Sequence, residues 1–80
     1  MQATRARRYQ EPALLLERHW AEVKALLEAH SVPEGEVEAL IQDTLIALLY
    51  KWESIADPEY WLMKTLEQRC RRLYGPAATD

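Results

Sequence analysis

The fold of this chain is decided by residues 35–52, which read Gly35-Glu36-Val37-Glu38-Ala39-Leu40-Ile41-Gln42-Asp43-Thr44-Leu45-Ile46-Ala47-Leu48-Leu49-Tyr50-Lys51-Trp52. On a helix with about 3.6 residues per turn, one face collects apolar side chains and one threonine. Its members are Val37, Leu40, Ile41, Thr44, Leu45, Leu48 and Trp52. This face is wide enough to bury against two neighbours, so we predict a central helix packed on both other helices.

The opposite face of this helix mixes polar and large apolar side chains. It carries Gln42, Asp43, Ile46, Leu49 and Tyr50. A bundle helix that meets only water on one side normally places Lys, Glu and Arg there. The mixture is instead typical of a surface that a partner covers, and it predicts a docking surface.

The length and composition indicate one small helical domain. The chain has 80 residues, two glycines and no phenylalanine, which leaves room for three helices and favours helix throughout. Its single cysteine, Cys70, cannot form an internal disulfide. Neither a signal peptide nor an apolar run of about 18 residues is present, so we expect a soluble, cytoplasmic protein without a membrane partner. The predicted fold is an all-α three-helix bundle over residues 12–75, with a basic N-terminal arm at 1–11 and a tail at 76–80.

Charge is distributed unevenly along the chain, although the net charge is only -3. Residues 1–10 contain three arginines and no acid, whereas residues 34–60 contain seven acids against Lys51 alone. Residues 61–80 are again rich in cations. The central helix therefore suits a basic protein, and the two ends suit phosphate groups.

A first helix is predicted from Pro12, which suits the first turn, to about His30. Its apolar stripe consists of Leu16, Trp20, Val23, Leu27 and His30. Residues 31–35 then break the helix, because they include Pro33 and Gly35. We interpret His30 as a structural residue at the negative end of this helix.

The third helix has the clearest boundaries in the chain. Asp57 is a good N-cap acceptor, Pro58 suits the first helical position, and Gly75 suits the position just after a helix that ends at Tyr74. Its inner face is predicted to contain Leu62, Leu66, Cys70 and Leu73.

The outer face of the third helix combines an aromatic ring, an amide and three cations. These residues are Trp61, Lys64, Gln68, Arg71 and Arg72. Aromatic rings stack on bases and cations neutralise phosphates, so this ridge suits single-stranded or opened nucleic acid. A purely structural interpretation also stands, because basic residues are favourable near a helix C-terminus.

Residue patterns for catalysis or metal binding are not found. The sequence has no nucleophile beside a base, no glycine-rich phosphate loop and no His-Glu-x-x-His pattern. Cys70, His19 and His30 do not follow a known metal-ligand spacing. We therefore expect a binding module rather than an enzyme, with no metal, cofactor or small-molecule substrate.

Residues 36–52 resemble the conserved-region-2 signature of the sigma-70 family, especially its extracytoplasmic-function group. Downstream, Tyr60-Trp61-Leu62-Met63-Lys64-Thr65-Leu66-Glu67-Gln68 is similar to the family's Trp-Leu-Tyr-Arg-Ile-Ala-x-Asn run. Upstream, residues 15–20 resemble the first helix of the same domain, so the resemblance covers about residues 13–74.

This resemblance implies two partners in transcription initiation. The first is the coiled coil, or clamp helices, of the β′ subunit of bacterial RNA polymerase, with Gln42, Asp43 and Leu49 at positions that match the family's contact residues. We predict Glu38, Ile46 and Tyr50 as further residues of the same polymerase-binding surface. The second is the promoter −10 element, recognised and opened through Trp61, Lys64, Gln68, Arg71 and Arg72.

Departures from the family pattern leave alternatives open. Gln68 replaces a frequent asparagine, Glu67 precedes it, and a domain that reads the −35 element is absent after Tyr74. The chain is then either an excised domain or a sigma-like regulator that binds an anti-sigma factor or core polymerase without recognising a promoter. A third alternative is a helical dimerisation domain that pairs through Ile46 and Leu49.

Overall fold

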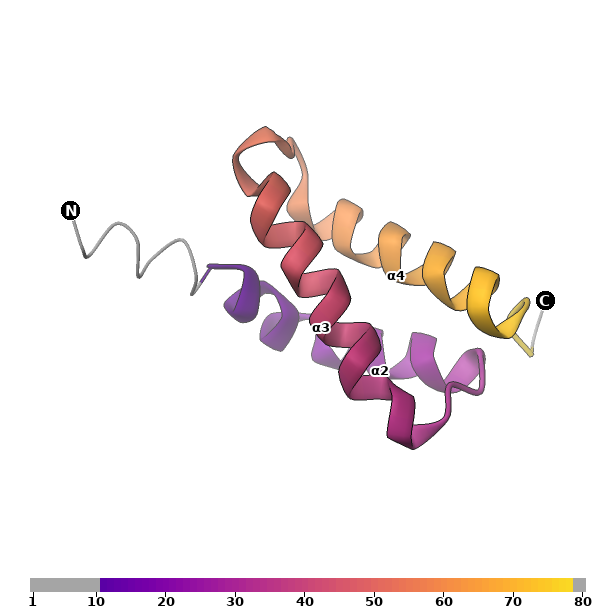
Figure 1. Cartoon of the computed structure of the whole chain (residues 1–80). Helices are drawn as coiled ribbons and strands as arrows, with labels where there is room; N and C mark the ends of the chain where they lie inside the picture. Colours follow the sequence, from indigo (N-terminus) through magenta and orange to yellow (C-terminus); the bar gives the residue numbers. More distant parts are fainter. Residues whose placement is uncertain (1–10, 79–80) are drawn as a thin grey trace.

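The computed structural model describes residues 11–78, and this part of the chain folds as four α-helices with no strand. A helix over residues 11–18 precedes α2 (Trp20–Ala29), α3 (Glu34–Lys51) and α4 (Pro58–Tyr74), and the short 3-10 helix η1 (Trp52–Ser54) follows α3 (Figure 1). The all-α prediction is confirmed. Residues 1–10 of the predicted arm, and residues 79–80 of the tail, lie outside the described residues. No helix within residues 11–78 combines the length and hydropathy needed to cross a membrane.

The first predicted helix is divided by a bend at His19, so the prediction of one continuous helix was wrong. His19 has φ -103° and ψ 19°. Two hydrogen bonds connect the helices across the bend: the His19 N–H donates to the Leu15 carbonyl, and the Val23 N–H donates to the His19 carbonyl. The buried positions repeat every four residues, at Leu15, Val23 and Leu27, with the partly buried His19 between them. Trp20 therefore lies at the edge of the inner face and is 43% exposed, whereas the sequence predicted it in the core.

The end of α2 forms a closed turn that continues into the start of α3. Ser31 adopts a left-handed conformation with φ 55°, its N–H bonds to the Glu28 carbonyl, and the N–H of Val32 bonds to the Leu27 carbonyl. This pair of bonds is the Schellman arrangement, which brings the apolar side chains at its two ends together. Val32 is thereby held partly buried beside the core.

The predicted inner face of α3 is turned toward the core. Leu40, Thr44 and Leu48 are buried, and Val37, Ile41, Leu45 and Trp52 are partly buried around them. The Thr44 hydroxyl donates to the Leu40 carbonyl at 2.8 Å, which satisfies the one polar group at these buried positions.

α4 packs against both α2 and α3. At its C-terminal end α3 also lies beside the N-terminal helix, to which Trp52 is hydrogen-bonded. α4 makes close backbone approaches to α2 and to α3, whereas α2 and α3 approach each other less closely. Leu62, Leu66 and Cys70 are completely buried on its inner face, and burial raises the pKa of the Cys70 thiol. Leu73 was predicted on this face but is 58% exposed. The inner positions of α4 repeat every four residues, so the position after Cys70 is Tyr74, and Leu73 lies outside the line.

The predicted ends of α4 are confirmed. The Asp57 carboxylate accepts a hydrogen bond from the Tyr60 N–H at 3.1 Å, and Pro58 occupies the first helical position. At the other end, Gly75 has φ 84° and donates its N–H to the Arg71 carbonyl at 2.9 Å. A residue with a side chain is strained at this φ, which explains the glycine.

Hydrogen bonds between distant residues fasten the C-terminal end of α4 to the rest of the fold. His30 is buried, and its Nδ1 lies 2.9 Å from the Gly75 carbonyl oxygen; because that oxygen only accepts, Nδ1 is the donor. The Ala78 N–H donates to the Ala29 carbonyl at 2.8 Å. Tyr74 donates its hydroxyl to Oε1 of Glu36 at 2.6 Å. The interpretation of His30 as a structural residue fits this position at the end of α2.

A further hydrogen bond attaches the N-terminal helix to the end of α3. Trp52 donates its indole N–H to Oε2 of Glu11 at 2.8 Å, across 41 positions of sequence. Glu11 was expected in the basic arm, but in the structure this residue is helical and takes part in the fold.

Replacing Asp57 by alanine is expected to lower the free energy of unfolding by about 1 kcal/mol, because the first turn of α4 loses its N-cap acceptor. Urea unfolding followed by circular dichroism measures the change. Asp57→Asn keeps an acceptor oxygen and should stay close to the wild type. An equal loss in the alanine and asparagine variants would show that the cap does not contribute.

The Tyr74–Glu36 hydrogen bond predicts an alkaline titration. Together with burial and the nearby negative charge of Glu36, this bond raises the pKa of Tyr74 to about 12 from its ordinary value of 10.0. A raised pKa means that the protonated phenol is favoured in the folded state. The contribution of the bond to stability is therefore complete below pH 10 and is lost as the pH rises through about 12.

The measurement is the ultraviolet absorbance of tyrosinate, taken as the difference between the wild type and Tyr74→Phe. Glu36→Ala should bring the transition down toward the ordinary value, whereas Glu38→Ala, two positions along the same helix, should not move it. Circular dichroism at each pH verifies that the helices persist. A transition of Tyr74 that is the same with and without the Glu36 carboxylate would contradict the assignment.

Candidate docking and nucleic-acid surfaces

The outer face of α3 is open to solvent in the described part of the chain. Ile46 is 53% exposed and Tyr50 is 85% exposed, although Thr44 and Leu48 on the same helix are almost completely buried. Gln42 and Asp43 are also exposed. The predicted docking residues on this helix are therefore accessible, with the exception of Leu49, which is partly buried.

Leu49 lies between two shallow hollows in the surface. One has a volume of about 130 Å³ and is formed with Pro12, Ala13, Leu45 and Ile46. The other has a volume of about 210 Å³ and lies toward the end of α3, beside Tyr50 and Trp52. Because Leu49 is partly buried between these hollows, it offers less surface to a partner than the sequence predicted.

One polar contact organises the beginning of this surface. The Gln42 side-chain amide donates to Oε1 of Glu38 at 3.5 Å, one helical turn away. At this length the bond is weak, so a partner with better hydrogen-bonding groups can replace it at little cost.

The outer ridge of α4 is only partly as predicted. Lys64, Gln68 and Arg72 are exposed, and so is Arg71, whose Nε lies 3.4 Å from Oε1 of Glu67. Trp61 differs from the prediction, because it is partly buried and packs against the core cluster. An indole is large enough to cover the edge of the core even from a flanking position, and less of the ring is then available for stacking on a base.

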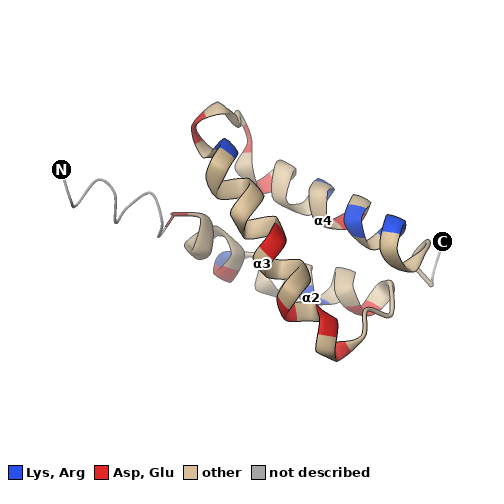
Figure 2. Ribbon diagram, viewed as in Figure 1, with Lys and Arg blue, Asp and Glu red and all other residues tan. Residues whose placement is uncertain are grey.

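α3 is mostly acidic, whereas cations outnumber acids toward the C-terminal end of α4 (Figure 2). The first half of α3 carries Glu34, Glu36 and Glu38, and Lys51 at its end is the only cation of the helix. α4 instead has Arg71 and Arg72 in its last turn. The predicted electrostatic division is therefore present in space, with acids on α3 and cations toward the C-terminal end of α4.

A His–Glu–Glu cluster joins the beginnings of α2 and α4. The Nε2 atom of His19 lies 3.2 Å from Oε1 of Glu59, and Nδ1 lies 3.6 Å from Oε2 of Glu22. The Nε2 atom is buried and forms no well-aligned hydrogen bond, so the contact with Glu59 is one of proximity only. Within residues 11–78, no group of three or more His, Cys, Asp or Glu side chains is arranged to hold a metal ion.

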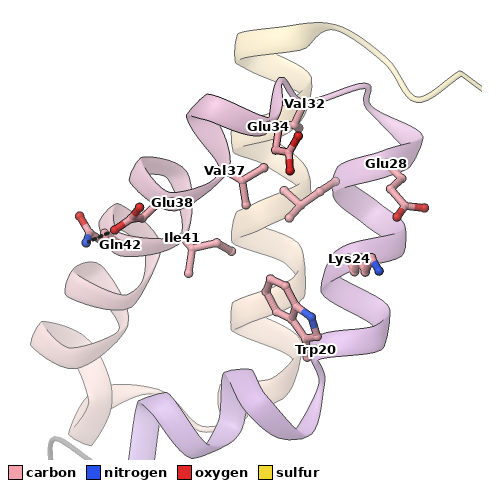
Figure 3. Close-up of a pocket in the computed structure, with 10 residues that line it drawn as sticks. Trp20, Lys24, Glu28, Val32, Glu34, Val37, Glu38, Ile41 and Gln42 are labelled. Carbon is pink, nitrogen blue, oxygen red and sulfur yellow. Dashed lines mark hydrogen bonds between the residues drawn. The ribbon is translucent and has the colours of Figure 1, made fainter.

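A groove between α2 and α3 was not predicted from the sequence (Figure 3). It has a volume of about 640 Å³. Its apolar lining consists of Trp20, Leu27, Val32, Val37 and Ile41, and its polar border consists of Lys24, Glu28, Glu34, Glu38 and Gln42. The sequence placed Trp20, Leu27, Val37 and Ile41 on core stripes and Val32 in the break between helices, but it could not show that α2 and α3 stand apart at this point.

Comparison with known proteins gives no matching family model, no matching curated protein and no matching solved structure. The resemblance to region 2 of sigma factors therefore remains a prediction that rests on the residues of α3 and α4 quoted above.

Proposed function

We propose that this chain is a sigma region 2-like module that binds the β′ clamp helices of RNA polymerase and the promoter −10 element. The observation that supports the proposal most strongly is the exposure of the outer face of α3. Ile46 and Tyr50 stand in solvent on a helix whose inner face is already buried. These two large side chains lie on the same face as Gln42, Asp43 and Leu49, which the family resemblance assigns to polymerase contact.

The chemistry of this face suits a coiled coil that carries both apolar and basic residues. Complete burial of a side chain such as isoleucine contributes roughly 1.5–3 kcal/mol, so Ile46 and Leu49 can supply much of the affinity. Gln42 and Asp43 are hydrogen-bonding groups beside this apolar centre, and they can fix the register of a basic partner.

The exposed cations of α4 support the DNA-binding part of the proposal. Lys64 and Arg72 lie on the solvent side of α4, and Arg71 lies near them although it is paired with Glu67. Such cations bind phosphates and release counterions, so binding should weaken as salt increases.

A second candidate function is supported by the same helix. In a sigma-like regulator, the chain binds core polymerase or an anti-sigma factor but does not recognise a promoter. Two observations favour this alternative: the Glu67 carboxylate lies 3.4 Å from Arg71, and the ring of Trp61 is partly buried against the core. The first reduces the positive charge, and the second the aromatic surface, that the ridge of α4 can present to a nucleic acid.

The polymerase contact is tested with the double variant Ile46→Ala, Tyr50→Ala. Both side chains are more than half exposed, so the fold should persist while the apolar centre of the surface is lost. We expect retention by core RNA polymerase in a pull-down to fall at least about tenfold.

The matched control is Leu14→Ala, Tyr60→Ala, which removes an aliphatic and an aromatic residue that are also more than half exposed, 52% and 64%, from other helices. This control should bind as the wild type does. If both double variants are retained equally well, the outer face of α3 does not bind polymerase. Sedimentation of the wild type at several concentrations addresses the dimer alternative, since self-association that Ile46→Ala, Tyr50→Ala abolishes would favour it.

The two candidate functions are separated by the fluorescence anisotropy of a labelled single-stranded −10 oligonucleotide. If the chain binds DNA, the affinity of the wild type should fall as salt increases. The double variant Lys64→Ala, Arg72→Ala should bind about tenfold more weakly, and its affinity should depend less on salt than that of the wild type. Lys24→Ala, Lys51→Ala removes the same charge from α2 and α3 and should have little effect. No binding at low salt, together with intact polymerase retention, would establish the regulator alternative.

A further inference from the structure

The groove between α2 and α3 lies beside the proposed polymerase surface but has a different lining. Ile46, Leu49 and Tyr50 do not line it, and only Glu38 and Gln42 border both. In Figure 3 the indole of Trp20 occupies one end of the groove, Val32 and Glu34 lie at the other end, and Val37 and Ile41 project from α3 between them. The groove is therefore a separate apolar surface of the domain.

The shape of the groove suits a helix of a partner better than a small molecule. Its α3 wall extends from residue 34 to residue 42, and at about 1.5 Å per residue this wall is about 12 Å long, or roughly two helical turns. Two turns present three apolar anchors on one face of an amphipathic helix. Both walls are themselves helices, so a third helix can pack between them.

The border of the groove indicates the charge of that partner. Three carboxylates, those of Glu28, Glu34 and Glu38, surround the apolar lining, and Lys24 is the only cation among the lining residues. Apolar anchors alone would not distinguish among partners. A helix with lysine or arginine beside its anchors gains attraction to both walls, whereas an acidic helix is repelled.

We propose that this groove binds a basic amphipathic helix of a protein partner, with apolar side chains seated between Trp20, Val37 and Ile41 and cations at the carboxylates. This proposal goes beyond the proposed function, because the groove and the outer face of α3 would hold different segments. Either proposal, the one for the groove or the one for the outer face of α3, can be wrong while the other is correct.

The experiment measures binding of a short synthetic helix with leucine on one face and lysine on the other, by isothermal titration calorimetry with the full chain. Trp20→Ala is expected to weaken binding about tenfold, because it removes the largest apolar group of the lining. Glu28→Gln, Glu34→Gln should weaken binding about fivefold and reduce its dependence on salt. Both glutamates are exposed, so this variant remains informative even if Trp20→Ala unfolds.

Matched variants test whether attraction is specific to the groove. Glu17→Gln, Asp43→Asn removes the same charge from exposed positions outside the groove, and Ile46→Ala, Tyr50→Ala alters the proposed polymerase surface. Neither should change the affinity for the peptide. A version of the peptide with glutamate in place of lysine should bind much more weakly than the lysine version.

Several results would overturn the proposal. One is an equal loss of affinity in the two charge variants, which would indicate attraction to the net charge alone. Another is a self-associating chain whose dimer is dissociated by Trp20→Ala, since a second copy would then occupy the groove. A third is a severalfold gain in peptide affinity when Arg5, Arg7 and Arg8 are replaced by alanine, since the occupant would then be residues 1–10 of the chain itself.

Discussion

The burial of one face of α4 against both α2 and α3 is the constraint on which the rest of the structure depends. Leu62, Leu66 and Cys70 have no exposed surface, and they follow one line along the helix at a spacing of four residues. In a domain of this size the apolar core is small, so each completely buried side chain is a large share of its stability. Cavity-forming substitutions at these positions are the most costly class of change available to the chain.

Because α4 forms the centre of the packing, α2 and α3 each need only one face to reach the core. The remaining faces are then available at the surface: the outer face of α3 with Ile46 and Tyr50, and the groove into which Trp20 projects. Polar contacts hold this arrangement at its ends, with His30 and Tyr74 at one end and Trp52 at the other. Each joins segments far apart in sequence, so together they position the helices that carry the candidate surfaces.

The two candidate surfaces differ in the forces they use. The outer face of α3 offers apolar area beside hydrogen-bonding groups, which gives affinity that salt changes little. The ridge of α4 offers exposed cations, which bind phosphate with strong salt dependence. The pair formed by Arg71 and Glu67 lies on this ridge and lowers its positive charge. Under the proposed function, binding at the ridge of α4 in addition to the outer face of α3 would separate a promoter-binding module from a regulator of the polymerase.

The amino-acid sequence by itself determined the helical class, the caps of α4 and the faces of α3. These features depend on residues close together in the chain, such as Asp57 and Tyr60, or on a regular spacing along one helix, as in Leu40, Thr44 and Leu48. The bend at His19, the exposure of Trp20 and Leu73, and the groove between α2 and α3 were decided only by tertiary structure. A helical stripe shows which side of a helix is apolar, but the separation and angle of the neighbouring helices decide how much of that side is covered.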